Sequence, residues 1–143
     1  AAAPAAAQDL VVGERAAYRS ITSALAAATP GATVRISAGV YREPTLEVRV
    51  PRLRIVGLPG STLDGEGKRE LLVIRANDVV VEGLTFVNTG VSQMQDRAAL
   101  RVIESARCRI ERNVFRETLF GVYLQRASDC VVRGNEMRSS GAG

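Results

Sequence analysis

A short phrase recurs in the second half of the chain, and it constrains the fold more than any other feature. The phrase begins at residues 79, 108 and 130, as VVVEGLTF, CRIERNVF and CVVRGNEM. The second and third copies begin 22 residues apart, and all three alternate apolar with polar side chains. A repeat of this length is typical of a solenoid, in which equivalent residues of successive coils stack on one another.

Short alternating segments follow one another from residue 33 onward and are separated by glycine and proline. Strands this short need partners, and in a solenoid each one pairs in parallel with its counterpart one coil away. The sequence therefore predicts an all-β protein, a right-handed single-stranded parallel β-helix of about four coils. The predicted strands are 33–36, 46–50, 53–56, 71–75, 79–82, 84–87, 100–103, 109–111, 114–116, 122–125, 131–133 and 136–138.

The N-terminal part divides into a flexible segment and a capping helix. Residues 1–16 are rich in alanine and are expected to be flexible, so the β-helix domain is expected to span 17–143. Residues 20–28 place four apolar side chains on one helical face, with Ser20 as the N-cap. We expect this helix to cover the first coil, because the end of a solenoid otherwise exposes its core.

Alignment of the three copies predicts which side chains point inward, because the spacing within each copy is the same. The inward series are Val73, Val79, Val81, Leu84 and Phe86, then Val102, Cys108, Ile110, Asn113 and Phe115, then Leu124, Cys130, Val132, Asn135 and Met137. Asn113 and Asn135 share one turn position, where stacked amides can bond to each other and to the backbone. An asparagine ladder is therefore favoured over a ligand site.

Cys108 and Cys130 are equivalent residues one coil apart, and three interpretations remain open. They can be small core residues, a disulfide formed in an oxidising compartment, or a pair of soft metal ligands. The first is favoured because free cysteine is among the most buried residue types.

An insertion interrupts the repeat before Leu100. Phe86 and Leu100 are 14 residues apart, whereas their counterparts Phe115 and Val122 are 7 apart, so the extra residues lie within 88–98. A loop that leaves a rigid scaffold is a common place for recognition. The candidate contact residues in this loop are Gln93, Met94, Asp96 and Arg97.

An outward stripe is predicted beside this loop. It stacks Leu72, Arg101 and Tyr123, with Ile74, Ile103 and Gln125 alongside, and its exposed aliphatic side chains are expected to be covered by the loop or the N-terminal segment. Arg101, Tyr123 and Gln125 complete the set of candidate contacts.

Composition narrows the chemistry that this chain can perform. It contains no histidine, the commonest general base and metal ligand. Its net charge of +4 is the balance of 19 basic and 15 acidic residues. The basic residues, all arginine except Lys68, are scattered over every coil, which favours a solvated surface over nucleic-acid binding. Glu70 is the only carboxylate beside the stripe and Asp64 is expected in a turn, so the paired carboxylates of a glycosidase are not identifiable. We assign no catalytic residue, metal or cofactor.

Several stretches carry a family resemblance. Residues 24–41 and 62–67 resemble the opening coils of exported right-handed β-helix proteins with the pectin-lyase fold. The segment from Asp96 to Val102 and residues 115–135 are similar to the N-terminal part of the NosD family of periplasmic maturation factors for nitrous oxide reductase. The resemblance extends over roughly residues 17–140.

This resemblance implies a role in denitrification. A NosD protein acts with ABC transporter subunits to assemble the copper–sulfur cluster of nitrous oxide reductase, as a periplasmic binding and delivery component and not as an enzyme. We expect the chain to be exported, at most peripheral to the membrane, and truncated at its C-terminus, because NosD proteins carry more coils. The copper-binding label of the family finds little support in a segment without histidine.

Two other functions remain open. The first is a carbohydrate-active β-helix enzyme, a polysaccharide lyase or a uronate epimerase, which would need acidic residues clustered near Arg101 and Tyr123. The second is a purely structural or adhesive β-helix.

Overall fold

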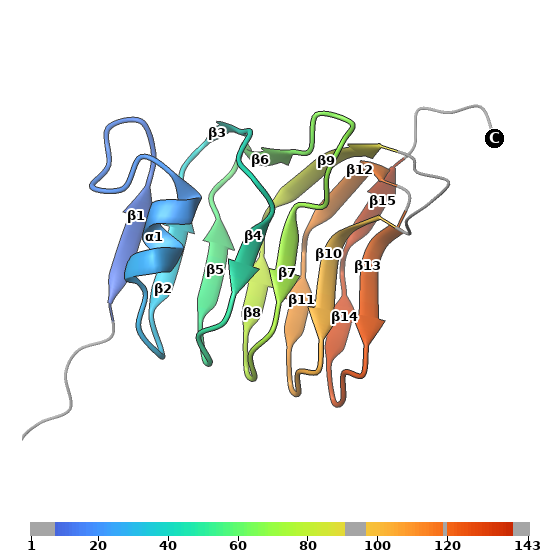
Figure 1. Ribbon diagram of the computed structural model, residues 1–143. Helices are drawn as coiled ribbons and strands as arrows, with labels where there is room; N and C mark the ends of the chain where they lie inside the picture. The colour runs from blue at the N-terminus through green and yellow to red at the C-terminus, as the bar shows by residue number, and fades with distance from the viewer. Residues whose placement is uncertain (1–7, 91–96, 119, 139–143) are drawn as a thin grey trace, which may run out of the picture.

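Three parallel sheets form the faces of a β-helix whose coils stack along one axis (Figure 1). The computed structural model describes residues 8–90, 97–118 and 120–138. Sheet A contains β1 (Asp9–Val12), β2 (Thr33–Ile36), β5 (Arg54–Gly57), β8 (Val80–Glu82), β11 (Arg109–Glu111) and β14 (Val131–Arg133). Sheet B contains β3 (Gly39–Tyr41), β6 (Ser61–Asp64), β9 (Thr85–Gly90), β12 (Val114–Thr118) and β15 (Glu136–Arg138). Sheet C contains β4 (Leu46–Val48), β7 (Leu72–Ile74), β10 (Ala98–Ile103) and β13 (Phe120–Gln125).

After β1, each coil takes one strand from each sheet in the order A, B, C. Within the described residues, four coils have all three strands, and β14 and β15 begin a fifth. The predicted right-handed parallel β-helix is confirmed. Successive side chains of a strand point to opposite faces of the sheet. Apolar residues at every second position of each strand therefore all point into the same core.

The N-terminal coil contains a helix in place of two strands. Helix α1 (Ile21–Ala27) begins at Ser20, whose hydroxyl accepts a hydrogen bond from the Ser23 N–H at 3.1 Å, as expected for an N-cap. The helix contacts β1, β2 and β4, and it buries Ile21 and Ala24 in the core. No helix in the described residues is long and apolar enough to cross a membrane.

Three strands have no counterpart among the predicted ones, namely β1, β3 and β6. Strand β1 lies within residues 1–16, so sheet A begins upstream of the expected boundary at residue 17. Asp64 is the last residue of β6 and not part of a turn. These strands are short and contain glycine, serine or aspartate, so their pairing with neighbouring coils defines them more than their own composition does.

The core consists of inward rows in which each side chain contacts its equivalent in the next coil. Phe86 and Phe115 form one such pair, with ring centroids 5.0 Å apart and planes within 8° of parallel. In the last described strands the inward residues keep their register but are partly exposed, as are Val132 (41%) and Met137 (58%).

The predicted register is wrong by one residue in sheet C. Val102 pairs with Ile74 and not with Val73, because the connection from β7 to β8 is one residue shorter than its counterpart from β10 to β11. Leu72 and Ile74 are therefore inward, only 1% and 0% exposed, and the predicted stripe of exposed aliphatic side chains is wrong. The outward row is Glu47, Val73, Arg101 and Tyr123.

The asparagine ladder is confirmed at the corner between sheets A and B. Asn113 Oδ1 accepts from the Leu84 N–H at 3.0 Å, and its amide donates to Val81 O at 3.1 Å. Asn135 Oδ1 accepts from the backbone and side-chain N–H groups of Asn113, and the amide of Asn135 donates to Ile110 O. The amides thus bind the backbone of neighbouring coils, and each of their polar atoms has a partner within the protein.

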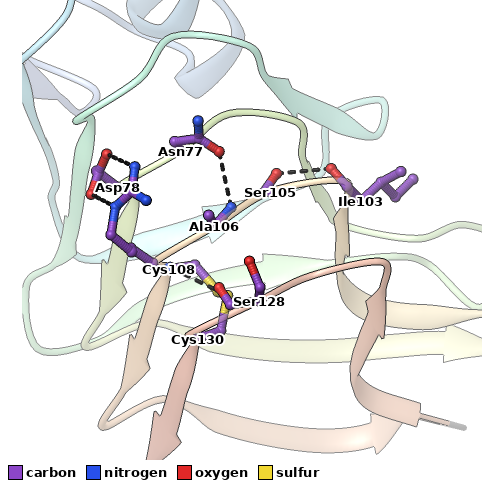
Figure 2. The surroundings of a disulfide bond; sticks show 9 residues. Asn77, Asp78, Ile103, Ser105, Ala106, Cys108, Ser128 and Cys130 are labelled. Carbon is purple, nitrogen blue, oxygen red and sulfur yellow. Dashed lines mark hydrogen bonds and ion pairs between the residues drawn. A yellow bond between two sulfur atoms is a disulfide. The ribbon is translucent and has the colours of Figure 1, made fainter.

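The two cysteines form a disulfide, so their favoured interpretation as unbonded core residues is wrong. Cys108 and Cys130 lie in adjacent coils with Cα atoms 4.5 Å apart, within the range that a disulfide spans (Figure 2). At the same corner, between sheets C and A, Asn77 Oδ1 accepts from the Ala106 N–H at 2.9 Å. The bond links coils covalently and occupies both sulfur atoms, so it excludes the thiolate pair considered as a metal site.

Candidate functional site

The corner between sheets B and C is where the coils differ most in length. The paired inward residues on either side of it are 5 residues apart from Tyr41 to Leu46, 9 from Leu63 to Leu72, 14 from Phe86 to Leu100 and 7 from Phe115 to Val122. The two longest connections belong to adjacent coils. Figure 1 shows the β6–β7 loop at the upper edge of the molecule.

A basic cleft of about 620 Å³ lies beside these connections. Its lining comes from the β6–β7 loop, the residue preceding β10 and the outward face of sheet C. The lining residues are Thr45, Lys68, Arg69, Glu70, Arg97, Arg101 and Tyr123. Four of these seven side chains are cationic and one is a carboxylate.

Glu70 and Arg101 form the floor of the basic cleft. The Arg101 guanidinium donates to the Glu70 carboxylate, with the shortest contact 2.5 Å, and neither side chain is more than 21% exposed. Glu70 also accepts a hydrogen bond from the Ala98 N–H at 2.8 Å, which ties the β6–β7 loop to the first residue of β10. The Arg101 guanidinium lies 4.7 Å from the centroid of the Tyr123 ring in a cation–π contact.

Arg97 and Lys68 are the cationic side chains of the lining that form no ion-pair contact with a described carboxylate, although Lys68 is close enough to Glu66 to help lower the pKa of that carboxyl. Arg97 donates to the backbone carbonyls of Thr89 at 3.2 Å and Gly67 at 3.4 Å. Lys68 is exposed on the β6–β7 loop. Neither residue forms an ion pair with a carboxylate in residues 8–90, 97–118 or 120–138.

Arg69 joins the basic cleft to a buried carboxylate behind it. It pairs with Glu66 at 2.7 Å and donates to the backbone carbonyl of Asp64 at 3.3 Å. Burial opposes ionisation of Asp64, but hydrogen bonds from the Glu66 N–H, the Asn88 amide and the Arg42 guanidinium outweigh it and lower the pKa of Asp64. This network holds the β6–β7 loop in place.

The structure brings together three of the seven candidate contact residues. Arg97, Arg101 and Tyr123 line the basic cleft. Gln125 is in β13 beside Tyr123 but outside the lining, and Gln93, Met94 and Asp96 lie outside the described residues.

Sequence reasoning missed the other side of the basic cleft. Lys68 and Arg69 were not candidates, and Glu70 was considered only as a neighbour of the stripe. The distance from Leu63 to Leu72 would have identified a second long connection, if Ser61–Asp64 had been recognised as a strand. Lys68 is also the single lysine of the chain.

The chemistry available in the basic cleft is binding of negative charge. Its one carboxylate is engaged by Arg101 and a backbone N–H, so it is not a free general base. Among the residues that the structure describes, no group of three or more His, Cys, Asp or Glu side chains is placed to hold a metal ion. Arginine, lysine and an exposed tyrosine suit recognition of carboxylates or other anions.

Comparison with known proteins identifies a relative in sequence. No protein-family model matches the chain. It is 32% identical over 104 residues to a protein of Stutzerimonas stutzeri named "Probable ABC transporter binding protein NosD". The aligned residues are 72% of this chain and 23% of that relative, so the chain spans about a quarter of its length.

Comparison with solved structures identifies the fold. A crystal structure of a pectin methylesterase in complex with a hexasaccharide superposes with a TM-score of 0.63 at 19% identity, over 88% of this chain and 49% of that one. The pectin methylesterase PemA of Erwinia chrysanthemi gives a TM-score of 0.62 at 18% identity, over 94% and 54%. At these identities the likeness establishes the right-handed β-helix and nothing about activity.

Proposed function

Since the chain is a NosD-like right-handed parallel β-helix, we propose that it is part of a periplasmic accessory protein for nitrous oxide reductase. In this role it acts with ABC transporter subunits in maturation of the copper–sulfur cluster of the reductase. It contributes by binding and delivery and not by catalysis.

One observation carries this proposal, namely the alignment with NosD over 104 residues. The relative in that alignment is named as a probable ABC transporter binding protein. The alignment includes most of the β-helix, but the chain spans 23% of the relative, so the activity and partners of the whole protein belong to the proposal.

The basic cleft is the proposed contact surface for a protein partner. Arg97, Arg101 and Tyr123 form its described part, and we propose that Gln93, Met94, Asp96 and Gln125 extend it. Arginine and tyrosine are enriched where proteins bind one another, because both offer large contact areas together with hydrogen-bonding groups.

The alternative of a carbohydrate-active enzyme is not favoured by the basic cleft. Acid–base hydrolysis of a glycoside needs two carboxyl groups on opposite sides of the scissile bond. The described lining has Glu70 alone, and Arg101 holds it.

Deletion of the gene that encodes the chain tests the proposal. Nitrous oxide reductase should still be produced, but with less copper and reduced activity, both measured on the purified enzyme. Complementation with the intact gene should restore both quantities. A gene with Arg97→Ala and Tyr123→Ala should restore them less, whereas Arg116→Gln, which removes an exposed charge on sheet B, should complement fully.

Unchanged copper content and activity after deletion would contradict the proposed function. Full complementation by the Arg97→Ala, Tyr123→Ala gene would retain the role of the protein but remove the basic cleft as its contact surface.

A further inference from the structure

We infer that the basic cleft binds an acidic peptide segment of a protein partner, whose carboxylates pair with Lys68 and Arg97. The inference rests on the proposed function for the existence of a protein partner, and it adds the chemistry by which that partner is recognised.

The charge balance of the lining is the first step. Arg101 pairs with Glu70 and Arg69 pairs with Glu66, so each of these arginines has a carboxylate at 2.7 Å or less. Lys68 and Arg97 pair with no carboxylate in the described residues, which leaves two positive charges in the cleft. A ligand that supplies two carboxylates would complete the same pattern of pairs.

Arg97 is held in position before any ligand arrives. Its Nη1 donates to carbonyl oxygens of two separate segments, Gly67 after β6 and Thr89 within β9. Those bonds limit the rotamers of the guanidinium, so binding a carboxylate costs less side-chain entropy than it would at a freely moving arginine. Lys68 is exposed on a turn, and its flexible stem can follow a second carboxylate along the ligand.

Tyr123 favours a peptide over a small inorganic anion. Tyr123 is 36% exposed, and the Arg101 guanidinium lies 4.7 Å from the centroid of its ring. A phosphate or sulfate would leave this apolar surface unused, whereas a peptide places aliphatic or aromatic side chains next to its acidic ones. Such a combination of aromatic and cationic anchors is typical of protein interfaces.

The size of the cleft agrees with an extended ligand. A volume of about 620 Å³ that is open to solvent on one side is far larger than a single carboxylate or phosphate requires. Several consecutive residues of an extended peptide would occupy it and contact both Lys68 and Arg97.

Isothermal titration calorimetry on the purified chain tests the inference. The probe is an acetylated and amidated eight-residue peptide of alternating glutamate and alanine, and its matched control has glutamine in place of glutamate. The glutamate peptide should bind at low ionic strength and weaken as salt is added, because exposed charge pairs are screened. The glutamine peptide should not bind measurably.

Three variants locate the binding. Lys68→Gln should weaken binding about fivefold, the effect of losing one exposed charge pair. Lys68→Gln with Arg97→Gln should weaken it by about tenfold or more, because both unpaired charges are gone. Arg116→Gln removes the same charge from another sheet and should change the affinity less than about twofold. Far-ultraviolet circular dichroism should be the same for all variants, which separates loss of binding from loss of fold.

Two further probes distinguish other sources of anions. Tighter binding of inorganic phosphate or of an oligogalacturonate than of the glutamate peptide would overturn the inference. Equal binding of the glutamine peptide, or an equal loss in Arg116→Gln, would overturn it as well. These measurements do not involve the reductase, so a failure here is separate from a failure of the maturation test.

Discussion

Two corners of the β-helix differ in how much their length varies between coils. At the corner between sheets A and B, five residues separate Val81 from Phe86, Ile110 from Phe115 and Val132 from Met137. At the corner between sheets B and C, the connections range from 5 to 14 residues. In these last three coils the first corner is constant, whereas Val34 and Tyr41 are 7 residues apart and Ile55 and Leu63 are 8 apart in the two coils before them. The second corner has a different length in every one of the four coils.

The difference shows where polar side chains remain available for a ligand. At the constant corner, Asn113 and Asn135 stack, and each amide binds the backbone of a neighbouring coil. At the variable corner, adjacent loops have unequal lengths, and Lys68 and Arg97 form no ion pair with a described carboxylate. Within the repeat, the asparagine amides form hydrogen bonds with the neighbouring coils. Where the repeat is interrupted, the cationic groups of Lys68 and Arg97 remain available to a ligand.

The backbone at the constant corner has the same conformation in successive coils of the repeat. Gly83 has φ of 77°, and a Cβ there would lie 2.5 Å from the carbonyl oxygen of Gly57 in the coil before. Arg112 occupies the equivalent position in the next coil with φ of 56°. These coils thus make the same left-handed turn, and at Gly83 the turn is in close contact with the coil before.

The largest effect is expected for loss of a stacked core side chain. Phe86→Ala removes a fully buried ring that stacks on Phe115, and it should lower the free energy of unfolding by about 3–5 kcal/mol. Urea denaturation followed by circular dichroism measures the change. A loss below about 1 kcal/mol would mean that the coils do not pack as a continuous core.

Loss of the disulfide should have the next largest effect. The Cys108–Cys130 bond closes a separation of 22 residues, and Cys108→Ala with Cys130→Ala should cost about 3 kcal/mol. The same denaturation experiment measures it. A reducing agent should destabilise the parent chain and leave the double variant unchanged, and equal responses of both would show that the cysteines are not bonded.

The asparagine ladder should contribute less than the disulfide. Asn113→Ala leaves the Leu84 N–H without its acceptor in the core, which should cost about 1–3 kcal/mol. Asn135→Ala is the matched control and should cost less, because Asn135 is only partly buried. Equal losses for the two variants would show that burial does not determine the strength of the ladder.

Acid should weaken the network behind the basic cleft. The pKa of Asp64 is lowered on folding, so its ionised form stabilises the chain above the ordinary value of about 4. That contribution is lost as the pH falls from about 4 through the lower pKa of the folded state. Asp64→Asn should therefore flatten the decline of stability in this range, measured by urea denaturation at several pH values. An unchanged decline would exclude Asp64 as a source of it.

Loss of charge in the basic cleft should have the smallest effect on stability. Lys68→Gln removes an exposed side chain without a described ion pair, so the free energy of unfolding should change by less than about 0.5 kcal/mol. The same substitution is expected to weaken peptide binding. A large destabilisation would show that Lys68 supports the fold and would remove the contrast between the two corners.

Parts of the fold with a strong period could be predicted from the sequence. Strands 33–36, 109–111, 131–133 and 136–138 have the predicted bounds, and the pairing of Ile110 with Val132 was expected from the repeat. The register of β7 could not be predicted, because Leu72, Val73 and Ile74 are all apolar and a run without alternation fits either facing. One residue of difference in the following turn determined which side chains point inward.

The candidate site was predictable only in part, for a related reason. The insertion before Leu100 was visible because both coils that flank it belong to the repeat, and it indicated Arg97. Arg101 and Tyr123 were candidates because they lie on the predicted outward stripe. Lys68 and Glu70 follow a strand with weak β-propensity, so the sequence did not show that their loop is also long.

The sequence alone determined the stack, since a repeated alternation of apolar side chains can bury them only by placing coils in register. It also determined that Asn113 and Asn135 are equivalent and that Cys108 lies above Cys130. Only the tertiary structure decided that the two cysteines form a disulfide and which charged side chains form ion pairs, because both depend on distances between atoms in adjacent coils. The basic cleft exists for the same reason: the β6–β7 loop and Arg97 lie far apart along the chain but line one cleft, because β7 and β10 are neighbours in sheet C.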